Sequence, residues 1–437
     1  MNSKALTKMQ SIILTFVIIF AVVSGAIIAK DFLDKNISSE TIKIGLLVDL
    51  DGVIGNHVLQ GTLLAAEEIN ENGGILGRQV EVIAEDRGDG RDLLFVTSAL
   101  NRLIGIDKVD FIIIHNPSGD IGFSCQDIIA EHKKITIAVS GNSDLFTQRV
   151  LDNYEKFKYF FKVQFNSSSI VTGITDSLLL CREITGFNKV GILSTDVSWA
   201  RTVTEGLNNY LSENGFDIVY QRSIPQELFD FSSYFAAAET AETEIIIPLI
   251  SGDQTIPFAK EYHDRQSPLL IYDGVIGEVG TLSGWNITGG KCNYISVSMA
   301  PIISGYPYTN KTLSVRTAFI ERWDSEIHDT GVRAYDALRF ILSDAIERAG
   351  TIETEAVIKA LETTKVETSQ ARNFIFTSSH DVMMGEDPNN PNADYSLMMV
   401  FQWQNGELAP IYPKQIMEEA GSNLIYPPWS GPWDKIN

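Results

Sequence analysis

Residues 61–86 read GTLLAAEEINENGGILGRQVEVIAED, and this stretch decides the fold. Small and apolar side chains recur at helical spacing in its first half, which predicts a helix over 56–71. The segment NGG at 72–74 ends that helix, because glycine accepts the left-handed conformation that a helix C-cap needs. The next segment, 79–86, reads as a strand. The glycines therefore turn a helix back under a sheet.

The same alternation of strand and helix runs on both sides of this stretch. Further strands are predicted at 42–50, 109–115 and 135–140, and a second series at 189–195, 216–224, 244–250 and 269–273, with helices between them. A long amphipathic helix at 334–350 follows, and then an antiparallel hairpin in which a polar loop joins 373–381 to 395–408. Because alternating strands and helices imply parallel pairing, the sequence predicts an α/β fold with two doubly wound parallel-sheet lobes.

The composition excludes several classes of function. The chain has 437 residues, 44% of them hydrophobic, and a formal net charge of −22. The length predicts two domains, and the negative charge repels phosphate backbones, so nucleic acid is not an expected partner. The three cysteines are far apart and are expected to be buried apolar residues. The sequence lacks a nucleotide fingerprint, a GxSxG or HExxH motif and a CxxC pair, so we expect no enzyme, no cofactor and no metal.

The N-terminus carries a targeting signal. Two lysines precede an apolar run at 11–29, which is close to the roughly 20 residues that span a bilayer. We expect residues 1–30 to form an uncleaved membrane anchor and 31–41 a polar stalk, with the rest of the chain extracellular or periplasmic. A weak cleavage site of small residues within the run leaves a removed signal peptide as the alternative.

The stretch at 61–86 closely resembles the first helix, turn and second strand of type I extracytoplasmic solute-binding proteins, the receptors of branched-chain amino acid ABC importers. The resemblance continues more weakly through YFFKVQ (159–164), the helix at 334–350 and FQWQNGEL (401–408), and covers most of 42–412. It implies a receptor that closes on a small polar ligand, foremost an amino acid, and delivers it to ABC permease subunits.

The same resemblance implies how the chain is divided. The family fold has two lobes joined by a three-crossing hinge, with the ligand in the cleft between them. By this resemblance lobe one comprises 42–162 with 293–366, and lobe two comprises 163–292 with 367–430. Open α/β sheets bind ligands at the carboxyl ends of their strands, which independently places the site at the same edge.

Four candidate binding residues lie in loops after the third and fourth predicted strands. HNPSG carries Asn116 and Ser118, where the family has a hydroxyl-rich loop, and VSGNSD carries Ser140 and Asn142, where the resemblance implies contact with a ligand carboxylate. A hydroxyl, an amide and free N–H groups at a helix start suit an anion. The alternative is that Ser140, Asn142 and Ser143 only cap the next helix.

Three further candidates lie in the second series. Asp273 in LLIYDG stands where many family members carry an acid that receives the ligand ammonium, and Trp199 where an aromatic residue walls the ligand. Ser251 occupies a third loop. The family often has tyrosine and glycine after its first strand, whereas this chain has IGN at 54–56. This departure leaves an amide or urea-like solute open as the ligand.

Two other functions remain open from the sequence. The same fold serves as a sensory ectodomain, which would need a signalling partner subunit because the chain has one apolar span. An extracellular hydrolase would need a nucleophile–base pair or a metal site in the cleft, and no motif supports one. The favoured hypothesis is a membrane-tethered solute receptor.

Overall fold

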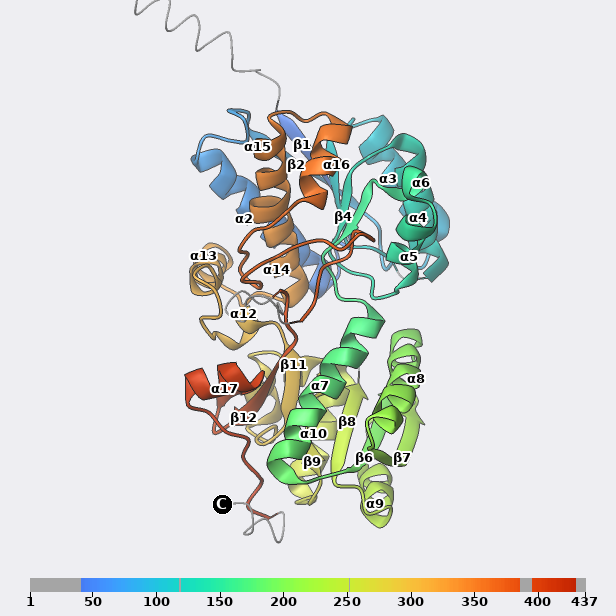
Figure 1. The fold of residues 1–437 in the computed structure, drawn as a ribbon, viewed down its shortest axis with the longest axis vertical. Helices are drawn as coiled ribbons and strands as arrows, with labels where there is room; N and C mark the ends of the chain where they lie inside the picture. Colours follow the sequence, from blue (N-terminus) through green and yellow to red (C-terminus); the bar gives the residue numbers. More distant parts are fainter. Residues whose placement is uncertain (1–40, 118, 251, 386–394, 430–437) are drawn as a thin grey trace, which may run out of the picture.

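A computed structural model describes residues 41–117, 119–250, 252–385 and 395–429. It consists of two α/β bodies that lie one beyond the other along the long axis of the molecule (Figure 1). The predicted anchor at 1–30 and nearly all of the predicted stalk at 31–41 lie outside the described residues. Within the described ranges, no helix combines the length and the apolar character needed to cross a bilayer.

The first body is built on a parallel five-stranded sheet with the order β2-β1-β3-β4-β5. Its strands are β1 (Ile42–Val48), β2 (Val80–Asp86), β3 (Phe111–Ile114), β4 (Thr136–Ala138) and β5 (Phe160–Lys162). The connecting helices are α2 (Val53–Glu71), α3 (Leu93–Gly105), α4 (Gly119–His132), α5 (Leu145–Asp152) and α6 (Tyr154–Phe157). The alternation predicted from the sequence is confirmed here.

The stretch that decides the fold joins α2 to β2 by a side chain as well as by its glycines. Gly73 and Gly74 have φ of +98° and +80°, so the helix ends in the left-handed conformation. Asn70 then bonds Val80 across the turn: its Nδ2 donates to the carbonyl at 2.8 Å, and its Oδ1 accepts from the backbone N–H at 2.7 Å. The last helical turn is thereby fixed to the first residue of the strand.

Helix α2 also crosses α14 (Asp329–Asp336) at backbone contact. A Cβ atom on Gly61 would lie 2.2 Å from the carbonyl oxygen of Gly331, and one on Gly331 would lie 2.6 Å from the carbonyl oxygen of His57. Only glycine on both helices allows this approach. The crossing connects the start of the chain to a helix more than 250 residues later.

The second body contains another parallel sheet, with the order β10-β8-β6-β7 and with β9 paired to β8. Its strands are β6 (Lys189–Thr195), β7 (Asp217–Ile224), β8 (Ile245–Ile250), β9 (Leu270–Ile271) and β10 (Val275–Ile276). Its helices include α7 (Ser167–Thr185), α8 (Ser198–Glu213), α9 (Ser232–Thr240), α10 (Thr255–Asp264) and α11 (Gly284–Thr288). The two bodies therefore repeat one architecture.

An antiparallel sheet adjoins the second body, and the last part of the chain supplies two of its strands. Strands β11 (Ser296–Met299), β12 (Met399–Gln404) and β13 (Glu407–Tyr412) pair in that order. The hairpin turns at residues 405–406, between β12 and β13, whereas the sequence predicts one across the polar loop that follows residue 381. The remaining helices are α12 (Pro301–Ser304), α13 (Thr312–Trp323), α15 (Ser343–Ala349), α16 (Thr354–Glu362) and α17 (Lys414–Ala420). A π-helical segment, Ala337–Leu342, lies between α14 and α15, where the sequence predicts one regular helix.

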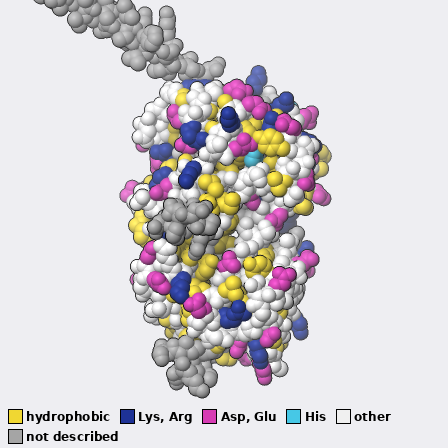
Figure 2. Space-filling model, in the orientation of Figure 1, with side chains coloured by type: hydrophobic (Ala, Val, Ile, Leu, Met, Phe, Trp, Pro, Cys, Tyr) yellow, Lys and Arg dark blue, Asp and Glu magenta, His cyan; other side chains and the backbone are white. Residues whose placement is uncertain are grey.

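The buried side chains form separate cores for the two bodies, and the chain changes core three times. Residues up to Val163 pack around the first sheet, those from Ile170 to Val297 around the second, those from Ala300 to Val382 around the first again, and Val400 to Leu424 around the second. Figure 2 shows hydrophobic side chains gathered along the middle of one face, between the two bodies. The lobe boundaries stated above stay a prediction.

Candidate ligand-binding site at the strand ends

The carboxyl ends of the strands in both sheets point toward the junction of the two bodies. Strand β5 ends at Lys162, directly before the chain leaves the first core, and all strands of that sheet are parallel to it. Helix α7 then runs away from the junction, and β6 returns toward it (Figure 1). Loops that follow these strands are therefore the elements able to hold a ligand between the bodies.

A buried arginine lies at this edge of the first sheet. Arg87 follows β2 and is only 7% exposed. Its Nη2 lies 3.2 Å from Nδ1 of His115, and its Nη1 donates to the carbonyl of Gly88 at 3.4 Å. Within the described part of the chain no carboxylate lies within ion-pair distance of Arg87, and its Nε has no hydrogen-bond partner. The site thus holds a buried cation that lacks a counter-ion.

His115 does not neutralise the positive charge of the Arg87 guanidinium. Burial and the neighbouring Arg87 lower the pKa of His115 to about 3, so its ring is neutral at physiological pH and accepts from the guanidinium. Burial also lowers the pKa of Arg87, while the carboxylates of Asp49 and Asp89 raise it from a distance. Neither of these acids lies within ion-pair distance of the guanidinium, so an anion from outside the protein could serve as its counter-ion.

Asn116, a residue predicted from the sequence, lies next to this pair. Its side chain is 4% exposed, and neither Nδ2 nor Oδ1 has a hydrogen-bond partner among the residues that the structure describes. The Oγ of Ser140 donates to the Asn116 carbonyl at 3.2 Å. Gly141 has φ of +95°, and a Cβ atom there would lie 2.9 Å from the Asn116 amide nitrogen. Asn116 and Ser140 are thus brought together, and their role as ligand contacts stays a prediction.

Asn142 connects the same loop to the second body. Its Oδ1 accepts from Gln164 at 3.0 Å, and its carbonyl accepts from the backbone N–H and the hydroxyl of Ser167 at 2.8 and 3.0 Å. Ser167 is the first residue of α7. Ser140 and Asn142 make no capping bond to α5, whose N-cap residue Asp144 makes none either. Ser143 does accept from the backbone N–H of Leu145, the first residue of α5, at 3.3 Å, so capping describes Ser143 but not Ser140 or Asn142.

Asp273 lies inside the second body rather than open at its edge. It is fully buried at φ of +41°, and its two carboxylate oxygens accept hydrogen bonds from Ser177 of α7 and Ser298 of β11. Burial raises the pKa of Asp273 to about 6, and the two serine hydroxyls oppose that shift. A ligand ammonium would have to displace a serine to reach it.

The remaining predicted residues fall into two groups. Trp199 is half-buried in the first turn of α8 and packs against the core of the second body. Ser118 and Ser251 lie outside the described residues. Arg87 and His115 are not predicted from the sequence, because their burial and their contact with each other arise only in three dimensions.

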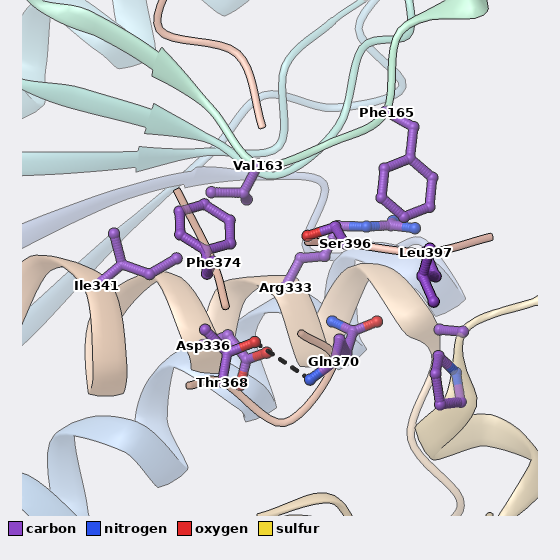
Figure 3. A pocket seen from close by; sticks show the side chains of 12 residues that line it. Val163, Phe165, Arg333, Asp336, Ile341, Thr368, Gln370, Phe374, Ser396 and Leu397 are labelled. Carbon is purple, nitrogen blue, oxygen red and sulfur yellow. Dashed lines mark hydrogen bonds between the residues drawn. The ribbon is translucent and has the colours of Figure 1, made fainter. Parts of the chain in front are cut away.

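The three segments that pass between the bodies enclose a small cavity, which the sequence does not predict. Phe165, Pro301 and Leu397 each come from a different segment and line it. Figure 3 shows the Arg333 side chain beneath the Phe165 ring, at 5.3 Å from its centroid, and Arg333 also donates to Asp329 at 2.6 Å. Gln164 donates to Asn142, whereas its neighbour Phe165 lines the cavity beside Arg333.

The two bodies also approach each other at one point beside α14. His328 precedes α14 and lies 2.8 Å from the Asp329 carboxylate. Burial opposes charge on His328, yet Asp329, with help from Glu278 of the second body, keeps its pKa above the usual value. Leu282, from the same segment as Glu278, packs against the first core. The gap between the bodies is therefore narrow here.

The comparisons with known proteins agree with this architecture. A family model described as periplasmic binding protein matches residues 41–407. A Leu/Ile/Val-binding protein homologue of Brucella abortus is 23% identical over 398 residues, covering 86% of this chain and 92% of its own length. A Streptococcus pneumoniae branched-chain amino acid transporter protein in complex with isoleucine has a similar fold, at 17% identity and a TM-score of 0.65, covering 86% of this chain and all of its own. An R. palustris solute-binding protein in complex with benzoate also has a TM-score of 0.65, at 15% identity, covering 85% of this chain and 96% of its own.

Proposed function

The chain belongs to the periplasmic binding protein family, and we propose that it is the receptor of an ABC importer for a small solute that carries a carboxylate. Proteins of this family bind solutes and are not enzymes. The proposal rests mainly on one observation at the strand ends: among the described residues, the buried Arg87 has no carboxylate partner and an unbonded Nε, and neither end of the buried Asn116 amide is bonded. Buried polar groups are normally paired, so their lack of partners needs a ligand to explain it.

A carboxylate is the chemical group that supplies what both side chains lack. It can accept from the Arg87 guanidinium and from the Asn116 amide at once, in charge-assisted bonds. Amino acids carry a carboxylate, and the name of the Brucella relative refers to binding of leucine, isoleucine and valine. Benzoate, which the R. palustris protein holds, also carries a carboxylate. Amino acids are therefore the first ligands to test, with other small carboxylates beside them.

We propose that the ligand is enclosed by rotation of the two bodies about the three segments between them. Hinge closure is a known mode for proteins of this architecture. The three changes of core along the chain and the narrow gap at Glu278 support it. Trp199, at the strand end of the second body, would then approach the ligand from the opposite side. Ser118 and Ser251 stay predictions as contacts.

We further propose that residues 1–30 anchor the protein in the membrane and that permease subunits dock on the rims of the two bodies. Apolar side chains are exposed after β1 and β2, including Val53 at 75% and Leu94 at 77% exposure. Because β1 and β2 are neighbours in the sheet, these loops lie on the same rim. Exposed apolar groups near one another are typical of an interaction surface.

A ligand screen tests the proposed receptor function. The full chain, purified in detergent, is mixed with amino acids, other carboxylic acids, small amides and urea, and its melting temperature is recorded. A ligand at 100 times its Kd stabilises the native state by about 2.7 kcal/mol, which raises the melting temperature by a few degrees. Titration calorimetry then confirms each hit. If no small solute of any class raised the melting temperature, the proposal would be wrong.

A further inference from the structure

We propose that the carboxylate alone anchors the ligand, on Arg87 and Asn116, and that an α-ammonium group is not required. The natural ligand would then be a small organic acid rather than a zwitterionic amino acid. This inference rests on the proposed receptor function and narrows its ligand class. Two observations support it: the first body has donor groups for an anion, and the acid of the second body that was expected to receive a cation is already bonded.

The first body offers a cation with a free donor edge. Arg87 uses one Nη on the neutral ring of His115 and the other on the Gly88 carbonyl, and its Nε has no partner among the described residues. A buried charge without a partner is strongly unfavourable. Asp49 and Asp89 act on Arg87 only from beyond ion-pair distance. One incoming anion completes the set of interactions.

Asn116 adds a second, neutral contact. Both ends of its amide lack partners in the part of the chain that the structure describes, so the conclusion does not depend on which end carries the nitrogen. Gly141 packs against this amide so closely that a Cβ atom there would lie 2.9 Å from the Asn116 amide nitrogen. The amide N–H can donate to a carboxylate, and its oxygen can accept from a ligand hydroxyl.

In the second body, the acid predicted to receive a cation is already hydrogen-bonded. Asp273 is the acid expected to receive an ammonium, but Ser177 and Ser298 occupy one carboxylate oxygen each, and the side chain is fully buried. Glu278, which also approaches the gap, acts on His328 of the first body. Among the described residues, Arg87 and Asn116 therefore favour an anion, whereas Asp273 and Glu278 already act on groups of the protein.

Four compounds of matched shape test the inference by titration calorimetry on the full chain. Leucine carries both charges, 4-methylpentanoate only the carboxylate, and leucinamide and 3-methylbutylamine only an ammonium. Benzoate serves as a second acid. We expect both acids to bind at least as tightly as leucine and the two amines not to bind.

Two variants assign the binding to these side chains. Arg87→Gln should weaken acid binding by roughly a hundredfold through loss of a charge-assisted pair. Asn116→Leu should also weaken it, yet raise the melting temperature of the free protein, because an unpaired buried amide is replaced by an apolar group of similar shape. A purely structural asparagine would show the opposite change in melting temperature. Arg322→Gln, which removes an exposed arginine of the same body, is the matched control.

The outcomes separate this inference from the receptor function. Binding of leucine without binding of either acid would overturn the inference and leave the receptor function intact, as would binding of the amines alone or of a neutral solute alone. Unchanged acid affinity in both Arg87→Gln and Asn116→Leu would also overturn it. Absence of binding by every solute class would count against the receptor function itself.

Discussion

Replacement of Asp273 by asparagine should change how the stability of the protein depends on pH. Burial raises the pKa of this carboxyl group from the ordinary 3.8 to about 6. A group whose pKa is raised in the folded state contributes stability that is fully present below pH 3.8 and is lost as the pH rises through about 6. Asparagine does not titrate, so the variant does not undergo the loss of stability that the wild type shows as the pH rises.

The size of the effect follows from the same two pKa values. A difference of about 2 units corresponds to about 3 kcal/mol of unfolding free energy. We expect the unfolding free energy of Asp273→Asn minus that of the wild type to rise by up to this amount between pH 4 and pH 7. The absolute difference in unfolding free energy also depends on how well the asparagine amide bonds with Ser177 and Ser298. The change of that difference with pH does not depend on these bonds.

Urea denaturation followed by tryptophan fluorescence at pH 4, 5, 6 and 7 measures this difference. The carboxyl groups of Asp336 and Asp381 also have a pKa raised to about 6, mainly by burial, but they titrate equally in both proteins and cancel. The exposed Asp51 gives a matched control, Asp51→Asn, which should show no rise. A difference for Asp273→Asn that stayed flat or fell with increasing pH would refute the reasoning.

Four further predictions follow from the described contacts. Gly61→Ala should lower the unfolding free energy by about 1–3 kcal/mol, because the new Cβ would meet the backbone of α14, although alanine is the better helix former. A Cβ on the control variant Gly105→Ala meets no atom within 4 Å. Equal effects of the two substitutions in urea denaturation would contradict the close helix crossing. Ligand should change the tryptophan fluorescence of the wild type, and Trp199→Phe should remove most of that change; a full response in the variant would exclude Trp199 from the site. Burial raises the pKa of all three cysteine thiols, so iodoacetamide should modify them only after denaturation, as mass spectrometry would report. The pair Val53→Asp and Leu94→Asp should leave ligand affinity unchanged and reduce uptake by the reconstituted importer; normal uptake would place the permease contact elsewhere.

The repeated strands and helices could be predicted because their signals are local. Each strand is a short apolar run, and each helix after it has a buried face at regular spacing. Helix α7 was missed because serine, threonine and glycine, which are poor helix formers, fill much of it. Its buried Ile170, Ile174, Leu178 and Cys181 carry a spacing of three and four residues that would have revealed it. Burial against the second sheet outweighs the weak local propensity.

The candidate site was predicted only where topology alone brings residues together. Asn116 and Ser140 each follow a parallel strand, so the sheet places them side by side. Arg87 also follows a strand, but its importance lies in a missing partner, which no local pattern encodes. The position of Asp273 was anticipated, whereas its two serine partners come from a helix and a strand far away in the sequence.

The backbone carbonyl of Asn142 gives the molecule a mechanical linkage. This oxygen receives both hydrogen bonds from the first residue of α7, while the loop that contains it also carries Ser140 beside Asn116. A solute that moves this loop would also move α7, which is nineteen residues long, and a change in the tilt of α7 would move the loop. Such coupling is reciprocal by thermodynamic necessity. The affinity for the solute and the angle between the two bodies would therefore change together. A partner that separates the bodies would weaken the binding of the solute.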